Sequence, residues 1–158
     1  MKTYEILKDG HELLGKKCSQ VEKFKDVDLR DQVNRMFETM DKFNGIGLAA
    51  NQVGLLNRVL VVNTRKMLDE NKKPVAGGWR GVMINPTVEF LNDELIADEE
   101  GCLSFPGVRL SVRRTLAINV SWQNLDGYIQ EKEFFGITAR CILHEFDHLN
   151  GITFRQRV

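Results

Sequence analysis

The sequence predicts an α+β fold in which antiparallel strands pack around a helix near the C-terminus, with an amphipathic helix closer to the N-terminus. Two helical stretches, residues 28–45 and 137–151, flank a central region whose apolar segments are short and rich in β-branched residues. Helices and strands that are separated along the chain in this way are typical of the α+β class. A chain of 158 residues with 42% hydrophobic content can bury one core, so we expect residues 1–158 to form a single domain.

The N-terminal helix is expected over residues 28–45, with Asp28 as its N-cap and Gly45 at its end. Its apolar residues recur at a spacing of three or four, which places them on one face: Leu29, Val33, Met36, Phe37, Met40 and Phe43. The last helix is expected over residues 137–151, and Asn150-Gly151 ends it. Its apolar side is made by Ile142, Phe146 and Leu149.

Three segments between the helices are expected to be strands. Residues 58–64 are apolar and β-branched, and Pro86 in residues 82–91 indicates an edge position or a bulge. The third strand starts at residue 115 and has one buried face, made by the alternating residues Leu116, Ile118, Val120 and Trp122. The sequence NLDG at 124–127 predicts a hairpin turn, and the polar residues 69–81 an exposed loop.

The bulk composition argues against several classes of protein. Lys and Arg number 22, as do Asp and Glu, so the chain has no excess positive charge with which to attract nucleic acid or a membrane surface. No apolar stretch approaches the roughly 18 residues of a membrane span, and the N-terminal sequence lacks the apolar core of a signal peptide. We therefore expect a cytoplasmic protein in which the three cysteines are thiols. Cys18 and His11 are expected at the surface.

The sequence HEFDH at residues 144–148 predicts a metal site. His144 and His148 are four residues apart, so their imidazoles can bind one ion from successive turns of a helix, with Glu145 as a candidate general base. The alternative is a helix that carries two histidines by chance. Random placement of the histidines and glutamates would give this spacing in only about one chain in two hundred, so we favour the metal site.

A catalytic metal site needs a third protein ligand and an open fourth position. Residues 149–158 contain no His, Cys, Asp or Glu, so the ligand is expected upstream, and a thiolate suits zinc or ferrous iron. Cys102 is the preferred ligand, because the glycines and proline around it in DEEGCLSFPG bend the strand. Cys141 lies seven residues before His148, about 10 Å along the helix, and is expected in the core.

Residues 44–54, NGIGLAANQVG, form a third notable stretch. It is a weak candidate for a phosphate loop, since it has no G-x-G-x-x-G pattern and follows a helix rather than a strand. It is also an ordinary way to end a helix in a tight turn. Its small residues would allow the backbone to approach a substrate closely, and the amide of Gln52 could donate to a developing oxyanion.

Together, these three stretches resemble the motifs of the peptide deformylase family, metal hydrolases that remove the formyl group from new chains beginning with N-formylmethionine. The family motifs are G-x-G-x-A-A-x-Q, E-G-C-L-S and H-E-x-x-H. This sequence has GIGLAANQ at 45–52, EGCLS at 100–104 and HEFDH at 144–148, in the same order. The similarity extends from about residue 28 to residue 154 and so covers most of the chain.

The resemblance implies that Cys102, His144 and His148 bind one divalent metal ion, with water as the fourth ligand. The family ion is typically Fe(II) in the cell, and Zn, Ni or Co can occupy the site. A metal-bound hydroxide would attack the formyl carbon, with Glu145 as general acid and base.

The resemblance also assigns residues to the substrate. Gln52 and the backbone N–H of Leu103 would form the oxyanion hole. The backbone of residues 46–48 would pair with the peptide like an added strand. Independently of the resemblance, we expect an apolar pocket for the methionine side chain, lined by Ile46, Ile137 and Cys141. The expected substrate-binding residues are Gly45, Ile46, Gly47, Leu48, Ile137 and Cys141.

The chain departs from the family pattern at both ends. Residues 6–18, ILKDGHELLGKKC, replace the Pro-Asp-x-x-L stretch of many members, and the C-terminal extension implicated in ribosome docking is absent, as in short-tailed members. N-formylmethionyl peptides or nascent chains are the expected partners; association with the ribosome is left open. Two other functions also stay open, a metallopeptidase of another kind and an inactive metal-binding module. The presence of Glu145 and Gln52 argues against the inactive module, because neither is needed to hold an ion.

Overall fold

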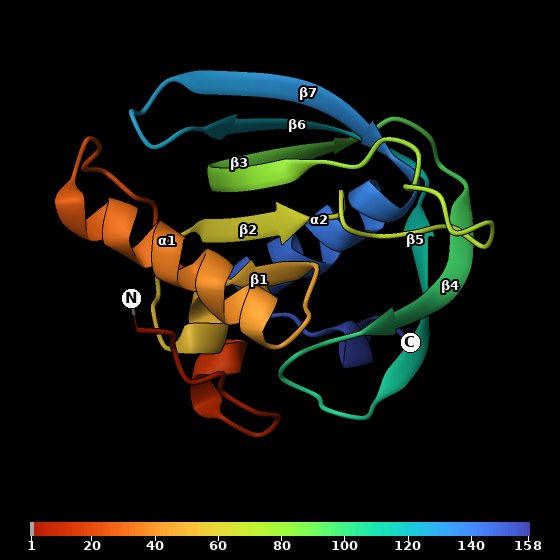
Figure 1. The fold of residues 1–158 in the computed structure, drawn as a ribbon, viewed down its shortest axis with the longest axis horizontal. Helices are drawn as coiled ribbons and strands as arrows, with labels where there is room; N and C mark the ends of the chain where they lie inside the picture. Colours follow the sequence, from red (N-terminus) through yellow and green to blue (C-terminus); the bar gives the residue numbers. More distant parts are fainter. Residues whose placement is uncertain (1) are drawn as a thin grey trace.

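The computed structural model describes residues 2–158, which form two antiparallel sheets and two α-helices (Figure 1). The larger sheet has the strand order β1-β2-β3-β6-β7, and the smaller sheet pairs β4 with β5. The strands are β1 (Gly47–Ala49), β2 (Val59–Asn63), β3 (Arg80–Phe90), β4 (Leu95–Gly101), β5 (Arg109–Thr115), β6 (Ala117–Gln123) and β7 (Ile129–Phe135). The α-helices are α1 (Val27–Lys42) and α2 (Gly136–Leu149), and short 3-10 turns are η1 (Glu12–Gly15), η2 (Ala50–Val53) and η3 (Phe154–Arg157). The predicted α+β class is confirmed.

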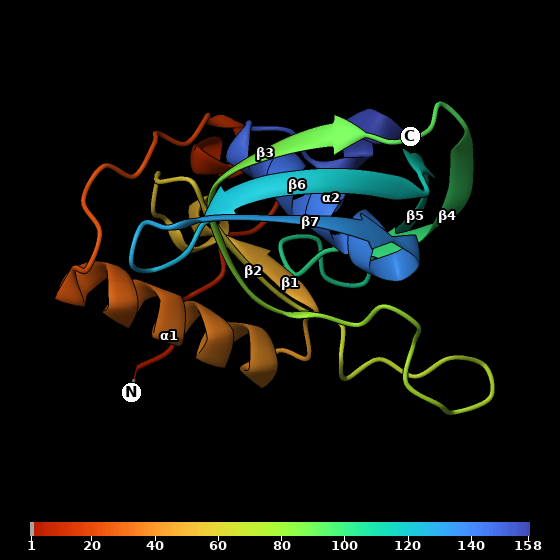
Figure 2. The same ribbon diagram turned by 90° about the horizontal axis from the view of Figure 1, so that it is seen from above.

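The two α-helices cover opposite faces of the larger sheet, and β2 lies between them. Val59 and Val61 pack in the core cluster that contains the apolar side of α1, whereas Leu60 and Val62 pack in the cluster that contains α2. All four side chains are fully buried, which explains why this strand is apolar without alternation. Helix α2 also contacts β5, so it lies against both sheets (Figures 1 and 2).

Helix α1 begins and ends earlier than the sequence pattern indicated. Asp26, not Asp28, is the N-cap, and its carboxylate accepts a hydrogen bond from the Leu29 N–H at 3.2 Å. The helix ends at Lys42, and Phe43 is 42% exposed rather than part of the buried face. Asp26 and Asp28 both precede the apolar periodicity, so spacing alone could not separate the two candidate caps.

The middle strands follow their predicted positions, with two corrections. β3 is bonded to β2 on one side and to β6 on the other, and its register shifts between Ile84 and Thr87. Pro86 therefore lies at a bulge, and the edge alternative is wrong. β6 and β7 form the predicted hairpin. Leu116 was expected on the buried face, but it precedes the start of β6 and is 49% exposed.

The N-terminal segment is more buried than its polar composition indicated. Cys18 was expected at the surface, but it is 3% exposed, and its N–H donates to the Leu149 carbonyl at 2.8 Å. An isolated bridge between Lys17 and Asn150 pairs this segment with the end of α2, which covers the thiol. Burial raises the pKa of Cys18 to about 11. His11 is exposed, as predicted.

Among residues 2–158, no helix combines the length and apolar character needed to cross a membrane.

Candidate metal centre

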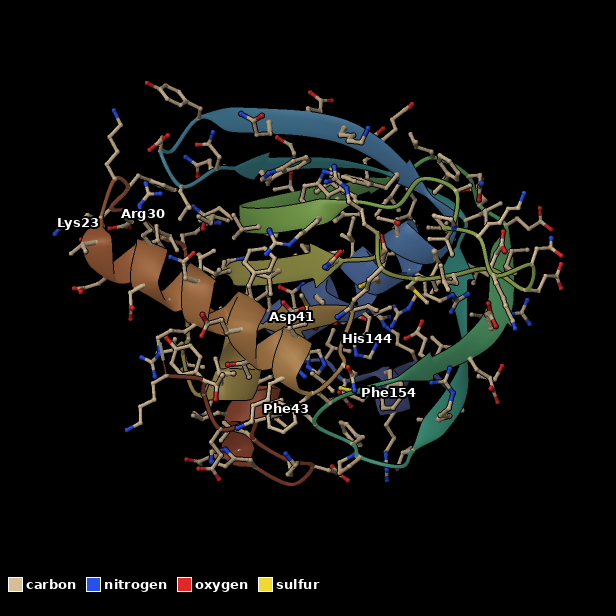
Figure 3. All side chains as sticks on the ribbon, viewed as in Figure 1. Lys23, Arg30, Asp41, Phe43, His144 and Phe154 are labelled. Atoms are coloured by element: carbon tan, nitrogen blue, oxygen red, sulfur yellow. The ribbon has the colours of Figure 1, made fainter. Side chains whose placement is uncertain are left out.

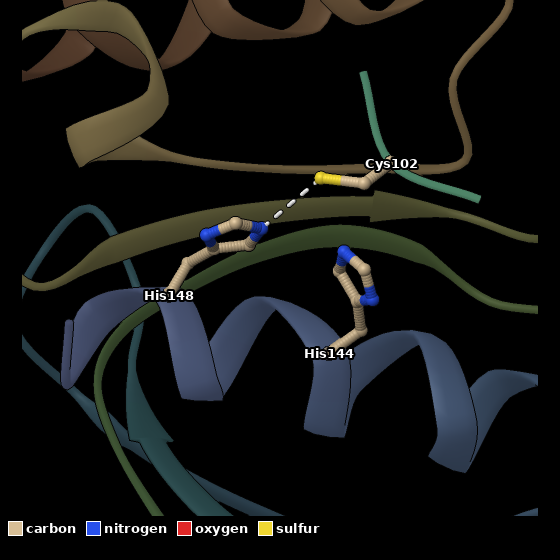
Figure 4. A group of neighbouring side chains, drawn as sticks. All are labelled: Cys102, His144 and His148. Carbon is tan, nitrogen blue, oxygen red and sulfur yellow. Dashed lines mark hydrogen bonds between the residues drawn. The ribbon is translucent and has the colours of Figure 1, made fainter. Parts of the chain in front are cut away.

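Two elements bring the three predicted metal ligands together (Figure 4). His144 and His148 lie one turn apart on α2, with their ring centroids 5.0 Å apart. Cys102 follows the last residue of β4, and its Sγ is 3.3 Å from Nε2 of His148. One ligand atom from each of the three residues lies within 4.8 Å of the other two. Cys141 is on the same helix as the histidines, but it is not part of this group.

A tight turn holds Cys102 in place. β4 ends at Gly101, and the Phe105 N–H then donates to the Cys102 carbonyl at 2.9 Å. Phe105 is itself 3% exposed and packs against Phe154, so the turn is held by a buried aromatic side chain. The bend that the glycines and proline predicted therefore directs the thiol toward α2.

The group fits a metal cation. One thiolate and two imidazoles are donors that suit zinc or ferrous iron, and ligand atoms of a tetrahedral zinc site lie about 3.3–3.6 Å apart. The surroundings of His144 also favour positive charge, whereas burial and the neighbouring His144 and Arg114 lower the pKa of His148. Burial would lower the pKa of His144, but Glu145, Cys102 and Glu100 outweigh it and raise that pKa to about 10. A cation in place of this proton would be stabilised by the same groups.

Glu100 orients one of the histidines, a role that the sequence analysis did not assign. Its Oε1 lies 2.8 Å from Nδ1 of His144, so this nitrogen donates to the carboxylate and leaves Nε2 free for an ion. Burial would raise the pKa of Glu100, but hydrogen bonds from His144 and Arg114 outweigh it and hold the pKa at about 2. The signal was present in the sequence, as the acid of the EGCLS stretch.

The Glu100 carboxylate belongs to a buried network of charges. Arg114 donates to it through Nε at 2.6 Å and Nη2 at 3.0 Å, and Arg140 donates through Nη1 at 2.8 Å. Arg114 also donates through Nη1 to Asp147 at 3.0 Å, and Asp147 is on α2 beside His148. The side chains of Glu100, Arg114 and Asp147 are all less than a tenth exposed. The arginines come from β5 and from α2 itself, so no local pattern in the sequence pointed to them.

Glu145 lies next to the candidate metal site and faces the cavity. Burial raises its pKa to about 7, and its Oε1 has no hydrogen-bond partner among residues 2–158. The backbone of β1 passes closely on the other side. A Cβ at Gly47 would lie 2.5 Å from Glu145 Oε2 and 2.9 Å from Cys141 Sγ, so only glycine fits there. A carboxyl group with this pKa and a free oxygen can take and return a proton near neutral pH.

Gln52 and Leu103 lie on the Cys102 side of the cavity. The Gln52 amide nitrogen donates to Ser104 Oγ at 3.1 Å and lies 3.6 Å from Cys102 Sγ, while its oxygen accepts from the Ala49 N–H at 2.9 Å. The bond to Ala49 fixes which end of the amide faces the thiol. Gly45 allows Leu103 to approach, because a Cβ there would lie 2.7 Å from Leu103 Cδ1.

The site opens into a cavity of about 810 Å³. Of the predicted substrate-binding residues, five line it: Gly45, Ile46, Gly47, Ile137 and Cys141. Cys141 lies at its wall, with Sγ donating to the Ile46 carbonyl at 3.3 Å. Leu48 does not line the cavity, and its side chain is fully buried in the cluster that faces α1. β1 is the edge strand of its sheet, and its first residue, Gly47, lines the cavity.

Comparisons with known proteins relate the whole chain to one family. The family model described as "Polypeptide deformylase" matches residues 3–158. The chain is similar to peptide deformylase from Thermotoga maritima, with 39% identity over 155 residues that cover 98% of this chain and 87% of that protein. It is also similar to peptide deformylase 1 from Corynebacterium glutamicum, with 38% identity over 158 residues, which cover 100% of this chain and 88% of that protein.

Solved structures agree with the sequence comparisons. The crystal structure of peptide deformylase from Thermotoga maritima has a TM-score of 0.86 and 37% identity, covering 100% of this chain and 99% of that one. A class I type b peptide deformylase from Acinetobacter baumannii, bound to Met-Ala-Ser, has a TM-score of 0.91 and 33% identity and covers 99% of each chain.

Proposed function

Because the chain belongs to the polypeptide deformylase family, it is a hydrolase that removes the formyl group from N-formylmethionine, and we propose that Cys102, His144 and His148 hold its metal ion. The observation that carries this proposal is the approach of a strand-end cysteine sulfur to two imidazoles of one helix, with one ligand atom of each residue within 4.8 Å of the others. When bound there, a divalent ion acts as a Lewis acid and lowers the pKa of a coordinated water toward about 7.

In this proposal Glu145 moves the proton. It accepts the proton of the attacking water and returns it to the departing amine, a role that typically contributes about 10²–10⁴ in rate. Its pKa of about 7, set by burial, and its unpartnered Oε1 support this role.

Gln52 and the backbone N–H of Leu103 stabilise the negative charge that grows on the formyl oxygen. Each such donor is worth about 10²–10³ in rate. The fixed orientation of the Gln52 amide, with its oxygen on the Ala49 N–H, supports this assignment, because the amide nitrogen then faces the site.

The substrate peptide extends the larger sheet by pairing with β1. An edge strand offers unpaired backbone groups, and the cavity is lined by Gly47 of β1 and by Ile46, which directly precedes the strand. Ile46, Ile137 and Cys141 then surround the methionine side chain, Gly45 leaves room for Leu103, and Leu48 contributes its backbone. A relative bound to Met-Ala-Ser supports a peptide in this place.

Further assignments rest on composition and donor chemistry. The resemblance to the family implies Fe(II) as the ion in the cell, and the thiolate and imidazole donors can also bind Zn, Ni or Co. Residues 1–158 form one catalytic domain, which the contacts of α2 with both sheets support. The partners are N-formylmethionyl peptides and nascent chains in the cytoplasm. Neither nucleic acid nor membrane is bound directly, in keeping with charges that cancel at 22 each.

Two measurements test the proposal together: metal content of anaerobically purified protein, and release of formate from formyl-Met-Ala-Ser. Glu145→Gln is expected to keep its metal and lose turnover by about 10²-fold or more. Cys102→Ser is expected to lose the metal, whereas the matched variant Cys141→Ser keeps it. Metal loss in Cys141→Ser, with full loading of Cys102→Ser, would move the site to the helix cysteine. An unformylated peptide is the control substrate, and its cleavage would indicate a metallopeptidase.

A further inference from the structure

The C-terminal turn η3 contacts both elements that carry the metal ligands. Phe154 is 1% exposed, and its ring packs edge-on against His144, with centroids 5.4 Å apart (Figure 3). The same ring packs edge-on against Phe105 at 5.2 Å, and Phe105 closes the turn that holds Cys102. The Phe154 ring therefore lies between His144 on α2 and the turn that holds Cys102, and it contacts both.

The same turn carries a second anchor, Arg157. Its Nε donates to Asp147 Oδ2 at 3.0 Å, and its Nη2 donates to Oδ1 at 2.9 Å. The Asp147 side chain is 8% exposed, so Arg157 makes a bidentate hydrogen-bonded ion pair with a buried carboxylate. Such a fork fixes the orientation of both groups, which a single hydrogen bond does not.

Asp147 connects Arg157 to the metal site through charged groups. Arg114 donates to both Asp147 and Glu100, and Glu100 in turn accepts from Nδ1 of His144. Each step is a hydrogen bond of 3.0 Å or less between buried groups. A shift of Asp147 would therefore be passed to the imidazole ring of His144.

We propose that η3 is a positioning element of the metal centre: Arg157 orients His144 through Asp147, Arg114 and Glu100, and Phe154 keeps the Cys102 turn against α2. Neither residue touches the ion or the substrate, so both are positioning residues. This inference rests on the proposed assignment of Cys102, His144 and His148 as ligands.

The test uses cobalt, because the absorption of Co²⁺ reports the geometry of its ligands and its bond to a thiolate. Metal-free full-length protein is titrated with Co²⁺ in competition with a chelator, well below the melting temperature. The variants are Arg157→Ala and Arg157→Lys. Arg155→Ala is the matched control, since Arg155 is on the same turn but meets the exposed Asp9 at 3.7 Å and the face of Phe105.

Arg157→Ala is expected to bind Co²⁺ about tenfold more weakly and to change the visible absorption of the cobalt-loaded protein. Arg157→Lys keeps the positive charge but cannot form the paired hydrogen bonds to Asp147. It is expected to recover part of the affinity for Co²⁺ and part of the wild-type absorption. Arg155→Ala should stay within about twofold of wild type. In formate release, the Arg157→Ala change should appear in kcat, with KM nearly unchanged.

Two results would overturn the inference, and they are distinguishable. If wild-type protein shows no thiolate-to-cobalt band, the proposed ligands are wrong and the inference falls with them. If wild type shows the band and Arg157→Ala matches it in affinity and spectrum, only the inference fails. If Arg157→Ala only lowers the melting temperature and leaves the Co²⁺ affinity and spectrum intact, the inference also fails, because Arg157 would then only hold the end of the chain in place. Should Arg157→Ala not fold, the same comparison is made between Arg157→Lys and Arg155→Ala.

Discussion

Glu100→Gln is the substitution whose effect follows most directly from the structure. The buried carboxylate accepts four hydrogen bonds, two from Arg114 and one each from Arg140 and His144. Glutamine keeps one oxygen but puts an N–H₂ group where the second oxygen was, facing groups that also donate. The substitution also removes the charge that balances two buried guanidinium groups.

Removing one partner of a buried ion pair costs about 3–5 kcal/mol, because the remaining charge is left uncompensated. For a chain of this size, each kcal/mol lowers the melting temperature by about 2–4 °C. We therefore expect Glu100→Gln to melt about 6–20 °C below wild type. Metal affinity should also fall about 10–100-fold, since His144 loses the charged carboxylate that orients its ring.

The assay is differential scanning calorimetry of metal-free protein at pH 7, followed by a Co²⁺ titration. Glu99→Gln is the matched control, because Glu99 precedes Glu100 on β4 but is exposed and meets Arg109 only at 3.7 Å. Its melting temperature should differ from wild type by less than about 2 °C, as exposed pairs contribute little. Equal melting temperatures for the two variants would refute the argument that the buried network stabilises the fold.

Three further predictions concern other parts of the site. Gly47→Ala should lower kcat/KM at least about tenfold, because its Cβ would lie 2.5 Å from Glu145 Oε2; unchanged formate release would show that β1 can shift away. Cys18 should resist iodoacetamide at pH 8 in folded protein, since it is buried with a pKa of about 11, whereas Cys102 of metal-free protein should react. Peptide mass spectrometry after timed labelling measures the extent of modification at each cysteine. Fast modification of Cys18 would contradict its burial. Addition of metal at about 100 times its Kd should stabilise wild type by about 2.7 kcal/mol and leave Cys102→Ser unchanged, as measured by calorimetry; an equal shift in both would exclude the thiolate as a ligand.

Much of the fold was predictable because its elements depend on local periodicity. The apolar spacing around Met36 and the alternation around Val120 report burial on one face, and both residues are fully buried. The ends of elements were less predictable. Leu116 continues the alternation of β6 by sequence, but it lies beyond the last residue that the neighbouring strand covers.

The burial of Cys18 could not be predicted, because it depends on pairing with the distant residue Asn150. In the candidate site, too, the features set by local sequence were predictable and those set by distant contacts were not. The metal-ligand pattern was visible because catalytic spacing on one helix leaves a local signature. Arg114, by contrast, became part of the site only through the fold, since nothing near it in the sequence marks an arginine that binds two buried carboxylates.

The shortness of β1 has a consequence for self-association. A strand edge that can receive an extended peptide can also receive a strand from another copy of the chain, which is how many proteins begin to aggregate. With only three residues, β1 offers few backbone groups to such a partner. Gly47 further weakens the strand, since glycine adds no side-chain packing. The edge that we propose to bind the first residues of a peptide is therefore a poor template for pairing with another copy of the chain.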